Sequence, residues 1–223
     1  MTYGGTLFEA YWSQHASRLP AGYREVEYIE STGEQVIDTG FVITTGEVSV
    51  QMDFLLTQDF AFWNGGFVFG VRGDGAYTLF TCSFPSATTV RLAVAKNTFE
   101  NYTISSVAAG TRHVLAYSRG SLVIDSAQYA IGDYPVRDSN EMSLYVFGRN
   151  AYDTAPTFVS GIRCFSFLIL DGGAEARKLV PCVRAADGKP GMYDLCGSIC
   201  PLTGTPFYVN AGTGTDFLWG ELS

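Results

Sequence analysis

The chain has 223 residues, of which 47% are hydrophobic and only 16% are charged. This balance excludes intrinsic disorder, which needs few apolar residues and many charges, and the length suits one large all-β domain. The 14 basic and 22 acidic residues give a net charge of −8. An acidic chain lacks the basic surface that binds phosphate backbones and anionic lipids, so we expect neither nucleic acid nor a membrane as a partner.

The cysteine and histidine counts limit the chemistry further. The first 20 residues lack the basic region and apolar run of a secretory signal, so an odd number of cysteines predicts free thiols in a reducing compartment. A zinc site at Cys182, Cys196 and Cys200 is the alternative, although neither histidine, His15 or His113, is near them in sequence. The five cysteines are Cys82, Cys164, Cys182, Cys196 and Cys200.

The first 20 residues differ in pattern from the remainder. Thr6 and Glu9 have the spacing of a capping box, and Pro20 ends the helix that this box would begin. The apolar residues of this segment would share one side of the helix. We therefore predict a helical extension over residues 1–20 that contacts a partner through Leu7, Phe8, Tyr11 and Trp12.

From Tyr23 onward the apolar period becomes two. In Glu47–Phe54 the residues Val48, Val50 and Met52 alternate with polar ones, which predicts a strand with one face on a core. Gly and Asp turns separate the other candidate strands, so the pattern predicts a two-sheet antiparallel jelly-roll sandwich over residues 21–223. The other candidates are Glu25–Glu30, Gln35–Gly40, Gly66–Val71, Tyr77–Ser83, Val90–Lys96, Arg112–Ser118, Leu122–Asp125, Met142–Gly148, Phe158–Leu170 and Lys178–Arg184.

Three predicted loops combine an aromatic residue with polar ones, over residues 62–66, 72–77 and 149–153. Sugars bind by stacking an apolar face on an aromatic ring while amides and carboxylates contact the hydroxyls. The alternative is that these aromatics cover the ends of the sandwich and that residues 72–75 form a hairpin tip. The candidate glycan contacts are Trp63, Asn64, Arg72, Asp74, Tyr77, Asn150, Tyr152 and Asp153.

Enzymatic chemistry has one candidate motif. Glu25, Glu27 and Glu30 have a spacing similar to the paired carboxylates of laminarinase-like glycoside hydrolases, although the central acid there is aspartate. The alternative is a half-buried strand with solvated glutamates. His113 alternates with Leu115 and Tyr117, which favours a position in a core or at an interface. We therefore expect a non-enzymatic protein, with glycoside hydrolysis as a lesser alternative.

Two separate motifs resemble a known family. The opening run Glu27–Gly40 (EYIESTGEQVIDTG) and the closing run Asp187–Asp194 (DGKPGMYD), followed by Phe207–Gly214 (FYVNAGTG), resemble a concanavalin A-like, laminin G-like jelly-roll family found in gut bacteria and their phages. The resemblance covers about residues 19–220 and implies the same sandwich. One departure is the segment Leu195–Pro206, which lengthens the closing hairpin.

The resemblance also implies a function. Such domains are usually non-catalytic parts of surface or phage fibre proteins, so it implies binding to cell-surface polysaccharide in a virion, or alternatively at a bacterial surface. A purely structural virion subunit is the second hypothesis, and the oligomeric state stays open. Laminin G-like relatives often hold a rim calcium, but no carboxylate cluster identifies one here, and no other cofactor is implied. The family motif residues Glu30, Asp38, Tyr193 and Asp194 have the positions of structural turns and strand ends.

Overall fold

The computed structural model describes residues 19–44, 46–58, 66–74, 79–95, 99–139, 141–152 and 154–222, and within them every regular element is a β-strand. The first sheet contains β1 (Tyr23–Glu25), β2 (Tyr28–Thr32), β4 (Val48–Leu56), β9 (Arg112–Ser118), β10 (Ser121–Ile124), β11 (Ala127–Ala130), β15 (Ser160–Asp171), β16 (Ala174–Arg184), β17 (Lys189–Asp194), β18 (Phe207–Tyr208) and β19 (Leu218–Gly220). The second contains β3 (Ile37–Val42), β5 (Phe69–Arg72), β6 (Leu79–Ser86), β7 (Thr89–Val94), β8 (Glu100–Thr103), β12 (Ser143–Val146), β13 (Gly148–Ala151) and β14 (Thr157–Phe158).

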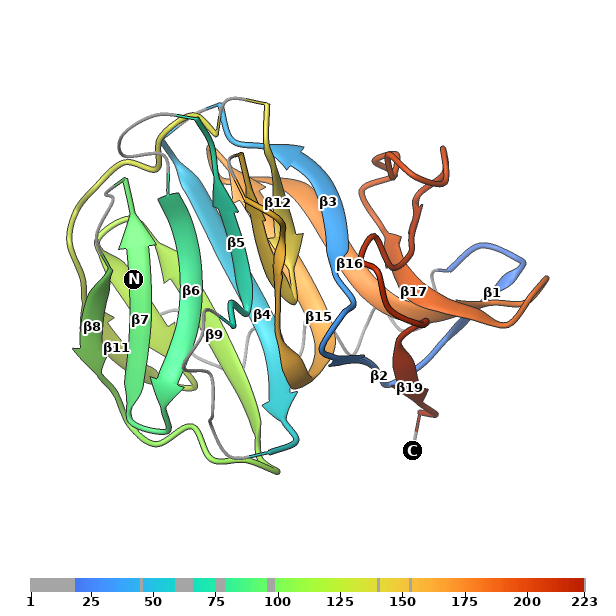
Figure 1. Cartoon of the computed structure of the whole chain (residues 1–223), viewed down its shortest axis with the longest axis horizontal. Helices are drawn as coiled ribbons and strands as arrows, with labels where there is room; N and C mark the ends of the chain where they lie inside the picture. The colour runs from blue at the N-terminus through green and yellow to red at the C-terminus, as the bar shows by residue number, and fades with distance from the viewer. Residues whose placement is uncertain are drawn as a thin grey trace.

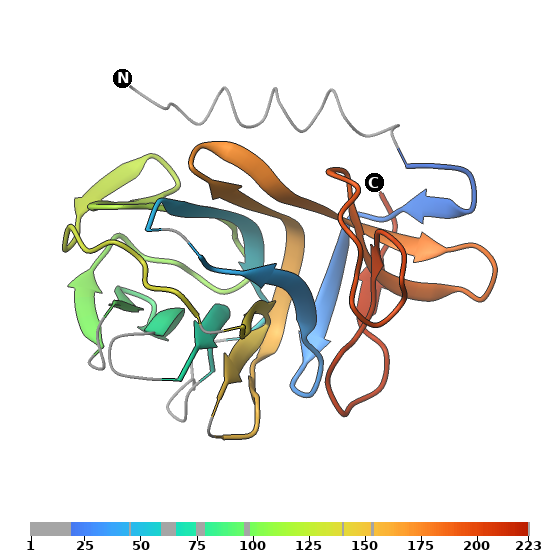
Figure 2. The ribbon, with the colours of Figure 1, turned by 90° about the horizontal axis from the view of Figure 1, so that it is seen from above.

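The two sheets lie face to face, with the second in front in Figure 1 and both layers visible from above in Figure 2. The main path of the first sheet runs β11-β10-β9-β4-β15-β16-β17-β18, and that of the second runs β14-β13-β5-β6-β7-β8. The described pairs are antiparallel, except that β13 runs parallel to β5. The prediction of an all-β fold with two antiparallel sheets is therefore confirmed.

The core between the sheets follows the period-two pattern of the sequence. On β4 the side chains of Val48, Val50, Met52 and Phe54 are at most 2% exposed and belong to the main core, as predicted. Phe69 on the facing sheet contacts Phe167 of β15 with a ring-centre distance of 6.0 Å. Burying such side chains is the main source of the sandwich's stability.

Some predicted strands are interrupted or extended. The predicted strand Glu25–Glu30 is two strands, because the amide of Val26 bonds to Pro181 O and that of Glu27 to Gly220 O. The chain thereby changes partners, from β16 for β1 to β15 and β19 for β2. Several strands without a clear alternating pattern escaped prediction because they are short and lie at sheet edges; they include β8, β11, β14 and β19.

The C-terminal part of the chain extends the first sheet beyond the second, at the right of Figure 1. β16 and β17 pair there over six residues, and a small second core forms from Cys182, Phe207 and Val209, against which Leu19 and Tyr23 pack. The extra segment 195–206 folds back on the sandwich, because Ser198 contacts Arg177 of β16 by a hydrogen bond of 2.9 Å.

The predicted N-terminal helix and its apolar side chains at positions 7, 8, 11 and 12 lie outside the described residues, as do Trp63, Asn64, Tyr77 and Asp153 of the candidate glycan contacts.

Candidate functional site

Two of the three predicted loops meet at one end of the second sheet. β13 pairs in parallel with β5, so that Ala151 lies opposite Arg72, and the N–H of Tyr152 donates to the carbonyl oxygen of Arg72 at 3.0 Å. Tyr152 is 59% exposed, and Asp74, two residues beyond the end of β5, is also exposed. The adjacent ends of β5 and β13 thus carry an exposed aromatic ring (Tyr152), a guanidinium group (Arg72) and a carboxylate (Asp74).

The end of β5 at the hairpin between β5 and β6 packs against the backbone of Ser139. Arg72 lies opposite Leu79 across the two antiparallel strands, so β5 and β6 form a hairpin, and residues 75–78 between them lie outside the described part of the chain. Gly73 packs on the backbone of Ser139, since a Cβ at Gly73 would stand 2.3 Å from Ser139 O. Ser139 is fully buried and bonds to Ile43, so this end of the sheet has a rigid base.

Asn150 has a structural role in this arrangement. Its Nδ2 atom donates to Ser143 O at 3.1 Å. Because β12 and β13 both pair with β5, this bond links the two strands to each other. Residues Arg149–Ala151, which the sequence placed in a loop, belong to β13. Asn150 and Ala151 pair in parallel with β5, and Arg149 pairs with Thr157 of β14. Asn150 therefore positions Tyr152, and its amide group is engaged within the protein.

The described residues next to the first predicted loop lie at the opposite end of β5. Phe67 precedes β5, whereas Arg72 ends it. The Phe67 ring is 4% exposed and lies between the guanidinium of Arg149, at 4.8 Å, and the ring of Phe99, at 5.9 Å. The guanidinium of Arg91 lies over the same Phe99 ring, 5.8 Å from its centre.

The outer face of the second sheet is closed at its centre. Thr81 and Ala93 alternate with core residues and point outward, yet each is only 1% exposed. Gly70 beside them leaves room for the Arg149 stem, because a Cβ there would stand 3.2 Å from the Arg149 side chain. A ligand thus has better access to the ends and edges of this sheet than to its centre.

Asp38 and Asp194, from the opening and closing motifs of the sequence, hold turns together. Asp38 Oδ1 accepts hydrogen bonds from Gly40 N at 2.9 Å and Ser143 Oγ at 2.5 Å. Asp194 is fully buried and accepts from the amides of Lys178 and Cys196 at 2.8 and 2.9 Å. These bonds fix the start of segment 195–206, whose path the sequence left open.

The three glutamates of the hydrolase-like spacing do not share one strand. Glu30 on β2 forms an ion pair with Arg163, with a distance of 2.8 Å between Nε and Oε2. Glu25 lies on β1 opposite Cys182, and burial raises the pKa of its carboxyl group to about 7. Its Oε2 atom is buried and has no hydrogen-bond partner among the described residues. Glu25 and Glu30 therefore lie on different strands and have different neighbours.

His113 and four of the five cysteines occupy interior positions. His113 is 4% exposed, with Nδ1 2.9 Å from Asp125 Oδ2 and Nε2 3.3 Å from Ala108 O, so of the two predicted positions it has the one in the core. All five cysteines are free, and only Cys196 is exposed. Partial burial raises the pKa of Cys196 to about 11, so little of it is the reactive thiolate at neutral pH. Within the described part of the chain, no three His, Cys, Asp or Glu residues come together as a metal site.

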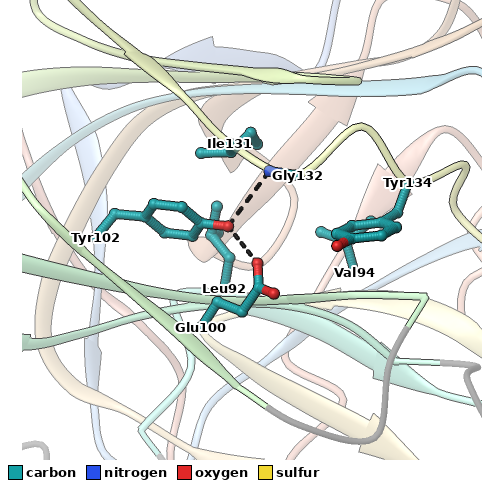
Figure 3. A pocket seen from close by; sticks show the side chains of 7 residues that line it. All are labelled: Leu92, Val94, Glu100, Tyr102, Ile131, Gly132 and Tyr134. Atoms are coloured by element: carbon teal, nitrogen blue, oxygen red, sulfur yellow. Dashed lines mark hydrogen bonds between the residues drawn. The ribbon is translucent and has the colours of Figure 1, made fainter.

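A small hollow lies at the edge between the sheets, where the sequence suggested no site. Figure 3 shows Tyr102 and Tyr134 on opposite sides of it, with Glu100 between them. The available sequence signal was the i, i+2 spacing in Glu100-x-Tyr102 and Gly132-x-Tyr134, which puts each pair on one side of an extended segment.

The described part of the chain has no helix with the length and apolar character needed to cross a membrane.

Comparison with known proteins shows a likeness at the level of structure alone. No family model matches the sequence, and no curated protein matches it. Among solved structures, domains LG4-5 of the mouse laminin alpha1 chain are similar with a TM-score of 0.44 and 15% sequence identity. The match covers 69% of this chain and 44% of the laminin chain, so the protein spans less than half the length of that neighbour.

Proposed function

We propose that this protein is a non-catalytic carbohydrate-binding module whose glycan site is the strand end formed by Arg72, Asp74 and Tyr152. The observation that carries the proposal is the 59% exposed ring of Tyr152, fixed beside Arg72 by the hydrogen bond between their backbones. A ring held on a strand end loses little conformational freedom when a ligand stacks on it, because its backbone is already ordered.

The chemistry of the three residues suits a sugar. The Tyr152 ring offers a face on which the C–H side of a pyranose stacks. Arg72 supplies N–H donors and Asp74 supplies carboxylate acceptors, which together match the mixed donor and acceptor character of sugar hydroxyls. A site on the end of a rigid sheet, with the centre of the outer face closed, suits recognition of a glycan presented at a surface.

The test is a glycan array of bacterial surface polysaccharides, followed by titration calorimetry on the strongest binder. We expect Tyr152→Ala to weaken binding at least tenfold without changing the melting temperature by more than about 2 °C. Leu218→Ala, which removes a similarly exposed side chain from β19 of the other sheet, is the matched control. Absence of binding to every polysaccharide, or equal affinities of Tyr152→Ala and the unmodified protein, would contradict the proposal.

The same polysaccharides test the hydrolase alternative. A non-catalytic module releases no reducing sugar from them. Release that is lost in Glu25→Gln or Glu30→Gln would instead assign catalysis to those carboxylates.

We further propose that the module belongs to a phage virion, with residues 1–18 as its attachment to another virion protein. The support is the family resemblance together with the apolar residues Leu7, Phe8, Tyr11 and Trp12. The first described residue, Leu19, packs on the small C-terminal core. A partner bound to residues 1–18 would therefore be connected to an ordered part of the protein. Deleting residues 1–18 should abolish incorporation into particles and leave glycan binding unchanged. Normal incorporation of the truncated protein would contradict this attachment.

A purely structural subunit is the second candidate function. It is favoured by two exposed apolar side chains on segment 195–206, Ile199 at 55% and Leu202 at 59%. Under this function, Ile199→Ser with Leu202→Ser abolishes assembly with neighbouring virion proteins in analytical ultracentrifugation, and no glycan binds.

A further inference from the structure

The outer face of the first sheet, which points away from the second sheet, carries an apolar strip. Phe167 of β15 pairs with Leu179 of β16, and both belong to the core, so the next residue on each strand points outward. These residues are Leu168 and Val180, and they are only 8% and 6% exposed. The strip continues on β9 and β10 with half-buried apolar side chains that alternate with core residues. They are Val114, Ala116 and Val123.

No described element covers the centre of this strip. Figure 2 shows the first sheet as the upper layer, and no described strand or loop lies over the middle of its outer face. Between the apolar strands, β4 contributes Gln51 and Asp53, and the charge of Asp53 is paired with that of Arg112. The outer face of an antiparallel sheet is usually polar where it meets water. An apolar strip on such a face therefore marks a contact surface.

The chain reaches the same face at its first described residue. Cys182 lies two positions after Val180 on β16, so both side chains point to the outer side of the sheet. Cys182 belongs to the small C-terminal core, and Leu19 packs on that core. Residues 1–18 therefore join the described chain at a point on the outer face, beside the strand that carries one end of the apolar strip.

Residues 1–18 have the length and the side chains to cover the strip. The sequence predicts a helix there, with Leu7, Phe8, Tyr11 and Trp12 on one side. A helix of this length extends about 27 Å at 1.5 Å per residue. The distance across the sheet from β16 through β15, β4 and β9 to β10 is about 19 Å, at roughly 4.8 Å between neighbouring strands. The predicted helix is therefore long enough to reach every strand of the strip.

We propose that the outer face of the first sheet is the docking surface for residues 1–18 of the same chain, whose apolar side chains cover Leu168 and Val180. The docking itself does not depend on the proposed function. Its consequence rests on the proposed attachment of residues 1–18 to another virion protein. The same apolar side chains cannot contact the sheet and a virion partner at once, so attachment requires the segment to leave the sheet. The free protein thereby keeps its attachment residues out of water until assembly.

Methyl NMR on the full chain tests the docking. We expect nuclear Overhauser contacts between the methyl groups of Leu168 and Val180 and the aromatic rings of residues 1–18. Deleting residues 1–18 should at least double the broadening of both methyl signals by a soluble paramagnetic agent. The methyl groups of Val50, which is 2% exposed in the core, should be unaffected and serve as the internal control.

Hydrogen exchange of residues 1–18, followed by mass spectrometry, gives a second measurement. Leu168→Asp places a charge in the strip and should accelerate this exchange at least tenfold. Leu202→Asp is the matched control, because Leu202 is 59% exposed on segment 195–206, and it should leave the exchange unchanged. Melting temperatures establish that each variant is folded. Where Leu168→Asp does not fold, Phe8→Ser with Trp12→Ser replaces it, because this double variant alters no described residue, and it should accelerate the exchange equally.

The outcomes separate the docking from the proposed attachment. Absence of the Overhauser contacts, or exchange of residues 1–18 at the rate of an unstructured peptide, would overturn the docking. A dimer in ultracentrifugation that loses the contacts on dilution would place the segment on a second copy and would also overturn it. If the docking fails and the truncated protein still does not enter particles, the attachment stands alone. If the docking is found and the truncated protein enters particles normally, the attachment is wrong and the docking stands.

Discussion

Arg112 and Asp53 form a two-pronged ion pair on the outer face of the first sheet. Nε of Arg112 lies 2.8 Å from Oδ1 of Asp53, and Nη2 lies 2.7 Å from Oδ2. The guanidinium also lies over the Phe165 ring, 4.0 Å from its centre. Asp53 points away from the core, as the alternation on β4 predicts, but Arg112 covers it and leaves it only 5% exposed.

Removing Arg112 should therefore cost far more than removing an exposed arginine. Arg112→Ala leaves the buried Asp53 carboxylate without its partner, and we expect a loss of about 2–3 kcal/mol in the free energy of unfolding. Urea unfolding followed by fluorescence measures it. Arg119→Ala is the matched control, because its partners Asp133 and Glu47 are exposed, and it should change stability little. Equal effects of the two variants would contradict the shielding of Asp53.

The alternation on β4 gives a second prediction. Val50 is 2% exposed between the sheets, so Val50→Asp buries an unpaired charge and should unfold the domain, at a cost of several kcal/mol. Gln51 points to the half-covered outer face, and Gln51→Asp should cost less than about 1 kcal/mol. Circular dichroism on heating compares them. Identical melting temperatures would be incompatible with the opposite orientations of these neighbours.

Glu25 predicts a pH dependence of stability. Its pKa of about 7 in the folded protein exceeds the ordinary 4.5, so folding favours the protonated form. The stabilisation is complete below about pH 4.5 and is lost as the pH rises through about 7. Because the side chain is only partly buried, we expect a loss of about 1–2 kcal/mol, below the roughly 3 kcal/mol that a fully buried group with this shift would give.

Unfolding curves between pH 4.5 and 8 measure this loss. Glu25→Gln should remove that part of the dependence and be the more stable form at pH 8, whereas Glu27→Gln controls for removing a charge from the same segment. A Glu25→Gln curve parallel to that of the unmodified protein would show that Glu25 ionises normally in the fold.

Two buried tyrosines should respond in opposite ways to loss of the hydroxyl. The Tyr117 hydroxyl is buried without a hydrogen-bond partner among the described residues, and burial raises its pKa. Tyr117→Phe removes this cost and should be neutral or stabilising by about 1 kcal/mol. The Tyr208 hydroxyl donates to Ser198 O at 3.3 Å, so Tyr208→Phe should destabilise by about 1 kcal/mol. Differential scanning calorimetry of both variants decides, and a destabilised Tyr117→Phe would mean that its hydroxyl is satisfied.

The sequence by itself determined the elements in which one face is apolar. Alternation made β4 and β9 predictable, including the inward direction of Val50 and His113, because a half-buried strand exposes every second side chain to a different environment. Gly and Asp turns marked the hairpin that begins at Arg72 for a similar local reason. The candidate residues Arg72 and Tyr152 were also found from sequence, since an aromatic beside polar residues in a turn is a local signal.

Only the tertiary structure decided which of these segments meet. The parallel pairing of β13 with β5 brings Tyr152 against Arg72, although these residues are about 80 positions apart in the sequence. Neither segment has an alternating apolar pattern that would predict this pairing. The break between β1 and β2 has the same origin, because it depends on a change of partner strand. The position of Gly132 and Tyr134 opposite Glu100 and Tyr102 likewise depends on where the edges of the two sheets meet. Such contacts depend on distances between distant backbones, which a one-dimensional pattern of polarity does not encode.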